Sequence, residues 1–128
     1  MLKLISKLVG SKSDRDLKKL QPYVESVTAF DAALKAMSND QLRARTVAFK
    51  ASIAEATAET KASKDALYAQ IDATPDYDAR EPLYEQIEAL DAQELELIEG
   101  VLSSIHPEAF GVMRETARRF NAGDVRAT

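Results

Sequence analysis

Apolar residues recur at alternating steps of three and four along two long stretches of this chain, residues 42–71 and 83–105. This spacing is typical of one face of an α-helix, so each stretch predicts a long helix. The polar stretch 74–78 between them contains a proline and predicts a short turn. Two such helices form an antiparallel hairpin, and their apolar positions coincide when Ile71 pairs with Leu83 and Phe49 with Ile105.

The middle of this hairpin is predicted to be its weakest part. In the same register Thr60 faces Glu94 and Ser63 faces Leu90, which places a polar layer between two apolar segments. Either Lys61 or Lys64 is close enough in the sequence to offset the charge of Glu94. An exposed pair of this kind adds at most about 1 kcal/mol.

Shorter helices are predicted on the N-terminal side of the hairpin. Residues 1–9 carry apolar positions at helical spacing, and Gly10 ends that short helix. Ser13 is a candidate N-cap for a second helix, whose apolar stripe continues over residues 17–34. Because a proline removes a backbone donor and crowds the preceding turn, Pro22 predicts a kink or a restart in this helix.

The ends of the later helices have signals of their own. Ser38 and Gln41 form a capping box, in which each side chain accepts the backbone N–H of the other residue. Pro107, which follows His106, predicts the start of a last helix, and residues 121–123 predict its end. The predicted fold class is therefore all-α: a short N-terminal amphipathic helix, a kinked helix, a long antiparallel hairpin and a final short helix.

The composition narrows the class of protein. The 128 residues are 45% hydrophobic and 30% charged and contain no cysteine, which excludes a disulfide framework and thiolate chemistry. No apolar run approaches the roughly 20 residues that span a bilayer. The net charge of −4 is unevenly distributed, because residues 1–19 carry six basic and two acidic side chains (+4), which leaves −8 for the remainder. A basic head on an acidic body fits an anionic surface or an acidic partner.

The sequence offers no pattern for catalysis or cofactor binding. The four glycines are too far apart for a phosphate-binding loop, and the single histidine, His106, beside a proline is more typical of packing than of catalysis. Residues 65–99 carry eleven acids against Arg80 alone, as a solvated helical surface does. Most of the eight Phe and Tyr residues lie on helical stripes, which favours core packing over base stacking. We therefore predict no catalytic, cofactor-binding or metal site, and no nucleic-acid partner.

Two interpretations of the basic head remain open on its pattern alone. It either docks its apolar face on the rest of the protein, or it lies at a membrane interface with its lysines near anionic lipid. The second interpretation makes the head a membrane- or channel-binding site. The residues of that candidate site are Met1, Leu2, Lys3, Leu4, Ile5, Lys7, Leu8 and Lys12.

Three runs in the chain resemble the amino-terminal region of SecA, the motor ATPase of bacterial preprotein translocation. They are residues 8–20 (LVGSKSDRDLKKL), 37–50 (MSNDQLRARTVAFK) and 106–120 (HPEAFGVMRETARRF). The stretch between the second and third runs resembles an insertion that some SecA lineages carry. His106 replaces the aliphatic residue that is usual in the family, and Gly111 replaces the usual alanine.

The resemblance implies a set of partners. The family's N-terminal basic helix is associated with anionic phospholipid and the SecYEG channel, which gives that role to residues 1–9 with Lys12. ATP and Mg²⁺ would be bound by the full-length parent and not by this piece, which implies no ATP hydrolysis here. The remaining SecA domains would be partners of this piece, and preproteins would be bound through the rest of the parent. The implied location is the cytoplasm, with the protein peripheral on the inner face of the bacterial plasma membrane.

The resemblance also implies a division of the chain. The expected segments are a basic N-terminal helix (1–12), a helical scaffold (13–53 and 101–121), an acidic hairpin insertion (54–100) and the start of a truncated downstream segment (122–128). The alternative function is a self-contained helical-hairpin adaptor that mediates protein–protein interaction. Reading the gene beyond Thr128 for a phosphate-binding loop would distinguish the two.

Overall fold

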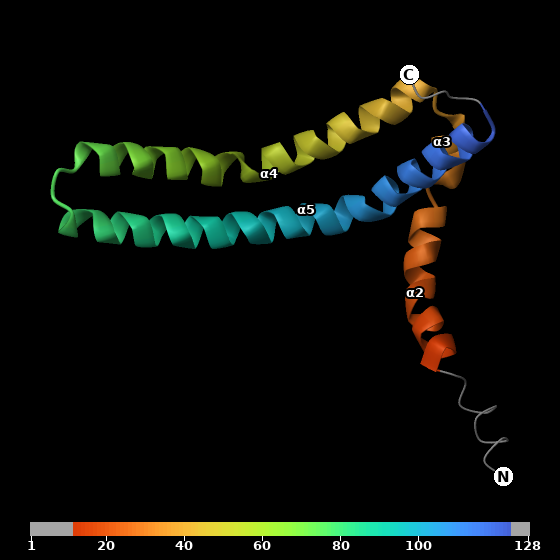
Figure 1. Cartoon of the computed structure of the whole chain (residues 1–128), viewed down its shortest axis with the longest axis horizontal. Coiled ribbons are helices and arrows are strands. Elements are labelled where there is room, and N and C mark those ends of the chain that lie inside the picture. Colours follow the sequence, from red (N-terminus) through yellow and green to blue (C-terminus); the bar gives the residue numbers. More distant parts are fainter. Residues whose placement is uncertain (1–11, 124–128) are drawn as a thin grey trace, which may run out of the picture. The chain divides into compact units, whose positions relative to one another are not determined.

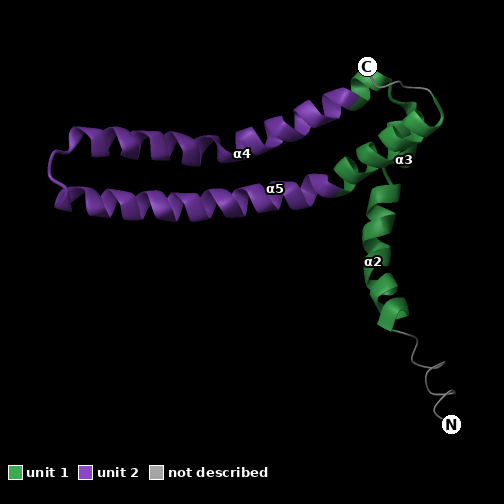
Figure 2. Cartoon of the chain, in the orientation of Figure 1, with its two compact units in different colours: residues 1–42, 107–128 green, residues 43–106 purple. Residues whose placement is uncertain are grey.

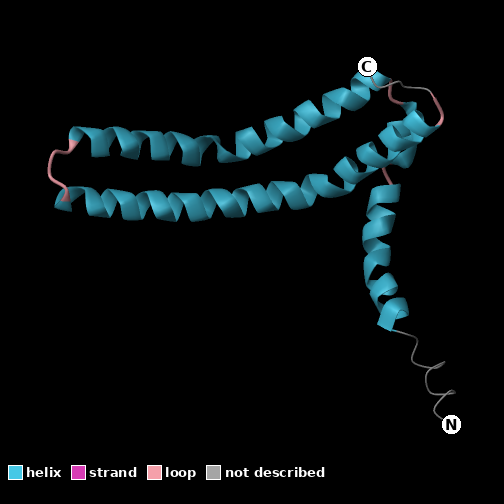
Figure 3. Ribbon diagram, in the orientation of Figure 1, coloured by secondary structure: helices cyan, strands magenta, loops and turns pink. Residues whose placement is uncertain are grey.

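The computed structural model describes residues 12–123, and this part of the chain is helical without a strand (Figures 1 and 3). The all-α prediction is therefore confirmed. The expected helix over residues 1–9 lies outside the described residues. The elements are α2 (Lys12–Thr28), α3 (Asp31–Ala36), α4 (Asn39–Ala73), the 3-10 turn η1 (Asp78–Arg80) and α5 (Glu81–Asn121).

The chain divides into two compact units (Figure 2). Unit 1 comprises residues 1–42 and 107–128, and unit 2 comprises residues 43–106. Both borders fall inside long helices, the first in α4 and the second in α5. The expected limits of the insertion, residues 54–100, stay a prediction.

Unit 2 is the predicted helical hairpin. Within it α4 and α5 run antiparallel (Figure 1). The most buried side chains of the unit are those of Ile71, Ile87, Thr57 and Thr60. Each apolar position expected on the α5 side, from Leu83 to Ile105, is buried or half-buried. The spacing of apolar residues therefore located the α5 face of the hairpin correctly.

The polar layer of the hairpin differs in detail from the expectation. Ser63, expected to face α5, is exposed, and Lys64 is half-buried instead. Lys64 Nζ bonds to Glu94 and lies 2.9 Å from Asp91 Oδ1, so Lys64 offsets Glu94 as predicted. Glu94 and then Asp91 raise the pKa of Lys64 above its ordinary value because they stabilise the ammonium form. The Thr60 hydroxyl bonds within its own helix, 2.9 Å from the Thr57 carbonyl.

The turn at the end of the hairpin lies where the sequence predicted it, because α4 ends at Ala73. The Asp76 carboxylate accepts the backbone N–H of Asp78 at 3.1 Å, which is the local bond that favours Asp in turns. Arg80 Nε donates to the Thr74 carbonyl at 2.6 Å, and the Arg80 guanidinium lies 4.8 Å from the ring centre of Tyr77. The single arginine of this acidic region therefore holds the turn together.

The start of α4 confirms the capping box. The Ser38 backbone N–H donates to Gln41 Oε1 at 2.8 Å, and the Gln41 backbone N–H donates to Ser38 Oγ at 3.2 Å. Each side chain thus satisfies a donor that the first helical turn leaves unpaired. The predicted end of the last helix is also confirmed, since α5 stops at Asn121 and Gly123 adopts a left-handed φ of 74°.

The prediction of a separate helix beginning at Pro107 was wrong. One helix, α5, runs through Pro107 for 41 residues. A proline inside a helix removes its own N–H and crowds the carbonyl four residues earlier, a disturbance of one turn that this helix accommodates. The Ser104 hydroxyl bonds to the Val101 carbonyl at 2.7 Å just before this point, and the helix continues on both sides.

The N-terminal helices also differ from the expectation. Pro22 does not restart α2, which is helical from Lys12 to Thr28, so Ser13 lies inside the helix and is not its N-cap. The break comes later, at Ala29 and Phe30, where the expected long stripe divides into α2 and α3. The Leu34 backbone N–H then bonds to the Phe30 carbonyl at 3.0 Å and begins α3.

The core of unit 1 forms where α2, α3 and the end of α5 meet. Its buried apolar side chains include Val27, Leu34 and Val112, with Leu34 only 1% exposed. Leu34 packs directly on the α5 backbone at Gly111, where a methyl group would lie 2.8 Å from Leu34 Cδ1. A glycine at this position therefore lets α3 approach α5 closely.

Candidate functional site

The candidate membrane-binding residues fall almost entirely outside the described residues. Met1, Leu2, Lys3, Leu4, Ile5, Lys7 and Leu8 all precede Lys12, which is the first residue of α2 and is exposed. The exposure of Lys12 is compatible with contact to a charged surface. The role of the other seven residues stays a prediction.

Helix α2 carries an exposed apolar face. Leu17, Leu20 and Val24 are spaced by three and four residues, and their side chains are 61%, 56% and 47% exposed. Arg15, Lys18 and Lys19 lie on the same helix and are exposed. The described part of α2 is therefore amphipathic, and its apolar face is largely open to solvent.

A second exposed apolar face lies on the part of α5 that belongs to unit 1. Phe110, Met113 and Phe120 are exposed, with Met113 at 71%. The opposite side of this helix carries Val112, Glu115 and Arg119, which are buried. The part of α5 in unit 1 thus has one buried side and one apolar side that is accessible to solvent.

The buried side of α5 contains a polar cluster centred on Arg119. Arg119 Nη2 donates to the carbonyls of Leu34 at 3.1 Å and Met37 at 2.7 Å, and Nη1 donates to Asn39 Oδ1 at 2.6 Å. Arg119 Nε donates to Glu115 Oε1 at 2.8 Å. One guanidinium therefore joins the end of α3 and the start of α4 to α5, using the several donors that only arginine offers.

Glu115 is the carboxylate of this cluster. Arg118 donates to both of its oxygens, at 2.8 and 2.9 Å, while Arg119 adds a further bond. Hydrogen bonds from Arg118 and then from Arg119 outweigh the opposing effect of burial and lower the pKa of Glu115 to about 2. The Glu115 carboxylate is ionised at neutral pH, and both of its oxygens accept hydrogen bonds from arginines. This arrangement favours a structural role over acid–base chemistry.

A small charged recess lies beside this cluster, with a volume of about 260 Å³. Its lining includes Asp31, Arg114 and Lys35 together with Glu115 and Arg118. Arg114 is paired with Asp31, just as Arg118 is paired with Glu115. Four of the five charged groups form these two pairs, so the recess has the character of a salt-bridge network.

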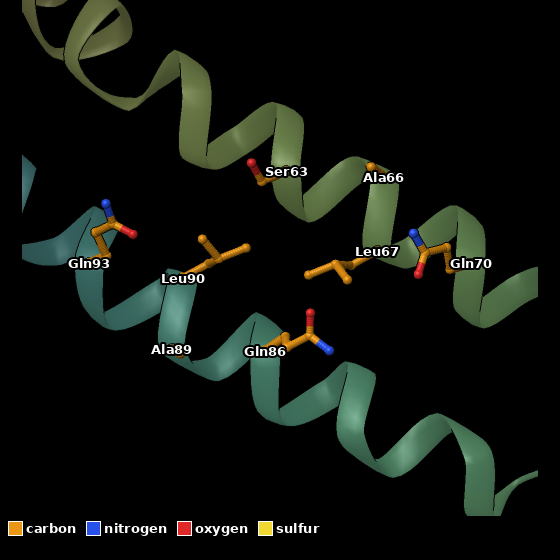
Figure 4. Close-up of a pocket in the computed structure, with 8 residues that line it drawn as sticks. All are labelled: Ser63, Ala66, Leu67, Gln70, Gln86, Ala89, Leu90 and Gln93. Carbon is orange, nitrogen blue, oxygen red and sulfur yellow. The ribbon is translucent and has the colours of Figure 1, made fainter.

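Unit 2 contains a larger groove between its two helices, with a volume of about 480 Å³ (Figure 4). It is open to solvent, and its lining comes from residues 63–70 of α4 and residues 86–93 of α5. Leu67 and Leu90 point toward each other across it, and glutamines stand along its margins (Figure 4). The groove offers an apolar floor with amide groups beside it.

Two further properties concern the whole described part of the chain. Among residues 12–123 no three His, Cys, Asp or Glu side chains are placed so that they could hold a metal ion. No helix within the same range is long and apolar enough to cross a membrane. The features that the geometry offers are therefore interaction surfaces and a structural polar cluster.

The sequence of this chain matches a known family. A family model described as the SecA DEAD-like domain matches residues 5–124. The chain belongs to the SecA family. The match includes both units and therefore includes the hairpin with its groove.

SecA relatives match over most of this chain. It is similar to the protein translocase subunit SecA of Christiangramia forsetii, with 41% identity over 117 residues, which are 91% of the chain and 10% of that SecA. The SecA of Amoebophilus asiaticus is 39% identical over 126 residues, or 97% of the chain and 11% of that SecA. The chain spans about a tenth of the length of these SecA relatives. No solved structure matches it.

Sequence reasoning missed the Arg119 cluster, although Arg119 lies within the third run that resembles SecA. Its signal was weak because an arginine near a helix C-terminus is ordinarily exposed and interacts favourably with the helix dipole. The position of Arg119 four residues after Glu115, and seven after Val112, places it on the buried side of α5. That spacing is the signal that could have identified it.

Proposed function

We propose that this chain is the N-terminal segment of a SecA-type protein translocase that drives preproteins through the SecYEG channel. The segment contributes membrane or channel contact and a helical scaffold. The observation that carries the proposal is the match to the SecA family over residues 5–124, which leaves little of the chain outside the family pattern.

The exposed apolar faces of unit 1 support the scaffold role. Leu17 and Leu20 on α2, and Met113 and Phe120 on α5, leave large apolar side chains in solvent. Covering such side chains contributes about 1.5 to 3 kcal/mol each. A SecA protein roughly ten times longer than this chain has ample further structure to cover these faces.

The basic head supports the membrane or channel role. Lys3, Lys7 and Lys12 lie beside apolar residues at helical spacing, and each lysine near an anionic membrane contributes about 1 kcal/mol. The proposed partners of the head are anionic phospholipid and SecYEG. The corresponding location is the cytoplasmic face of the bacterial plasma membrane, where the protein is peripheral.

Hydrolysis of ATP is assigned to the remainder of the parent protein, where ATP and Mg²⁺ bind. The four glycines of this chain are not spaced as in a loop that cradles phosphates. We expect no saturable heat of binding when the chain is titrated with ATP and magnesium. Binding in the micromolar range would mean that this chain holds a nucleotide site of its own, which contradicts the proposal.

Sedimentation with lipid vesicles tests the role of the head. Binding to vesicles that contain anionic lipid is expected to fall as salt increases, since screening acts over about 8 to 10 Å at physiological ionic strength. Replacing Lys3, Lys7 and Lys12 with Gln should weaken it. The matched control replaces three exposed lysines elsewhere, Lys35, Lys50 and Lys61. Equal binding of the two triple variants would favour a head that docks on the protein.

The adaptor hypothesis remains the alternative. A self-contained adaptor requires a stop codon soon after Thr128, whereas a SecA-type translocase requires a GxxxxGK[ST] loop further along the gene. The family match favours the translocase. Reading the coding sequence beyond Thr128 decides between the two proposals.

A further inference from the structure

The groove of unit 2 lies in a region of unusual charge. Residues 54–100 carry thirteen acidic side chains and three basic ones, so this stretch alone has a net charge of −10. The remaining residues together carry +6, since the whole chain carries −4. An open apolar groove therefore lies in the most acidic part of the protein.

Helical spacing places acids at the margins of the groove. Glu59 lies four residues before Ser63 on α4, Glu85 lies four before Ala89 on α5, and all of these residues are exposed. Side chains four apart share one side of a helix. Both acids therefore stand on the groove side of their helices, at the ends of its lining.

The three basic residues of the stretch 54–100 do not neutralise the acids beside the groove. Lys64 is held by Glu94 and Asp91, and Arg80 is held at the turn by Thr74 and Tyr77. Lys61 precedes Ser63 by two residues, a step that turns a side chain about 200° around the helix and away from the groove side. The acids beside the groove therefore remain available to an incoming cation.

We propose that this groove binds a cationic amphipathic helix of another protein. Leucine-sized side chains of the partner would cover Leu67 and Leu90, and its lysines or arginines would lie beside Glu59 and Glu85. An amphipathic helix in an apolar groove is a recurring mode of recognition. Anionic membranes and nucleic acids do not fit, because a surface of this charge repels them. The proposal does not depend on the translocase assignment.

A synthetic peptide of leucine and lysine, with leucines at helical spacing, is a suitable probe. Its affinity for the whole chain can be measured by fluorescence anisotropy. The groove variant A66K/A89K places two lysines on opposite margins of the groove, and the control variant A58K/A92K places two lysines at exposed positions of the same helices that lie outside the lining. The two variants have identical charge, and lysine is a good helix former at all four positions.

We expect A66K/A89K to weaken peptide binding at least about ten-fold, because like charges in a binding site are strongly unfavourable. The control should weaken it by less than about three-fold, since Ala58 and Ala92 lie outside the groove and charges there are screened. A peptide with glutamine in place of lysine should bind poorly. Equal loss in both variants would overturn the groove as the site, as would the absence of saturable binding to the unmodified chain.

A second measurement does not depend on lysine substitutions. Because the chain has no cysteine, a fluorophore sensitive to its surroundings can be attached at A66C, with A58C as its control. The peptide should shift the emission at position 66 to shorter wavelength and leave position 58 unchanged. If the chain alone associates with itself, and the shift at 66 follows protein concentration without peptide, the occupant is a second copy and the proposed partner is wrong.

Discussion

Replacing Arg119 with methionine removes the group that joins three segments of unit 1. Methionine keeps much of the aliphatic volume of the side chain and removes its hydrogen-bond donors and its positive charge. The change leaves the carbonyls of Leu34 and Met37, and the amide of Asn39, without the bonds that they accept from Arg119. It also leaves Glu115, which is 5% exposed, with Arg118 as its only cationic partner.

The expected cost follows from burial. Breaking a buried ion pair by removing one partner costs about 3 to 5 kcal/mol, because the remaining charge stays buried. Arg118 still binds Glu115 and lowers this figure, so we expect a loss of about 2 to 4 kcal/mol in the free energy of unfolding. The matched control is R118M. It removes a half-exposed arginine from the same carboxylate and should cost about 1 kcal/mol or less.

Urea unfolding followed by circular dichroism measures both losses, and hydrogen exchange locates them. In R119M the amides of α3 and the first turn of α4 should exchange faster, because the clamp on those segments is gone. In R118M they should keep most of their protection. Equal losses in the two variants, or exchange that increases only at the C-terminal end of α5, would refute the role given to Arg119.

Two further predictions concern the hairpin and the response to acid. Ile87→Ala should lower the free energy of unfolding by about 2 to 4 kcal/mol in thermal or urea unfolding, because Ile87 is only 5% exposed. Leu95→Ala, at a position that is 58% exposed, should lower it by less than about 1 kcal/mol. Similar losses would mean that the hairpin does not pack along this face. Because the pKa of Glu115 is lowered to about 2 from an ordinary value near 4.5, its contribution is complete above about pH 4.5 and is lost as the pH falls toward 2. The difference in melting temperature between the unmodified chain and E115Q should therefore shrink over that interval, and a constant difference would contradict the assigned pKa.

The hairpin was predictable because its determinants are local and repetitive. Apolar spacing identified the α5 face, and the short-range pattern of Ser38 and Gln41 fixed the start of α4 within a residue. Prolines were less informative. Pro107 and Pro22 each signal a possible break, but a helix tolerates the loss of one donor when the residues on both sides continue to bond.

The polar contacts were harder to predict because they depend on which side chains meet. Lys64 and Lys61 were equivalent candidates for Glu94 in the sequence, and only the helix geometry selects Lys64. Arg119 depends on carbonyls more than eighty residues away along the chain. Contacts of that range leave no periodic trace in a single sequence. The surfaces, in contrast, follow directly from charge and exposure.

The close approach of Leu34 to Gly111 makes the sizes of these two residues interdependent. The resemblance to SecA implies an alanine at the position of Gly111, and an alanine here would force the Leu34 side chain to shift, because its Cβ would lie 2.8 Å from Leu34 Cδ1. A SecA with alanine at this position should therefore carry a smaller residue in place of Leu34 or hold the leucine in another rotamer. The two positions are expected to vary together during evolution. A chimera that takes α3 from one SecA and α5 from another would inherit either an overlap or a void at this point.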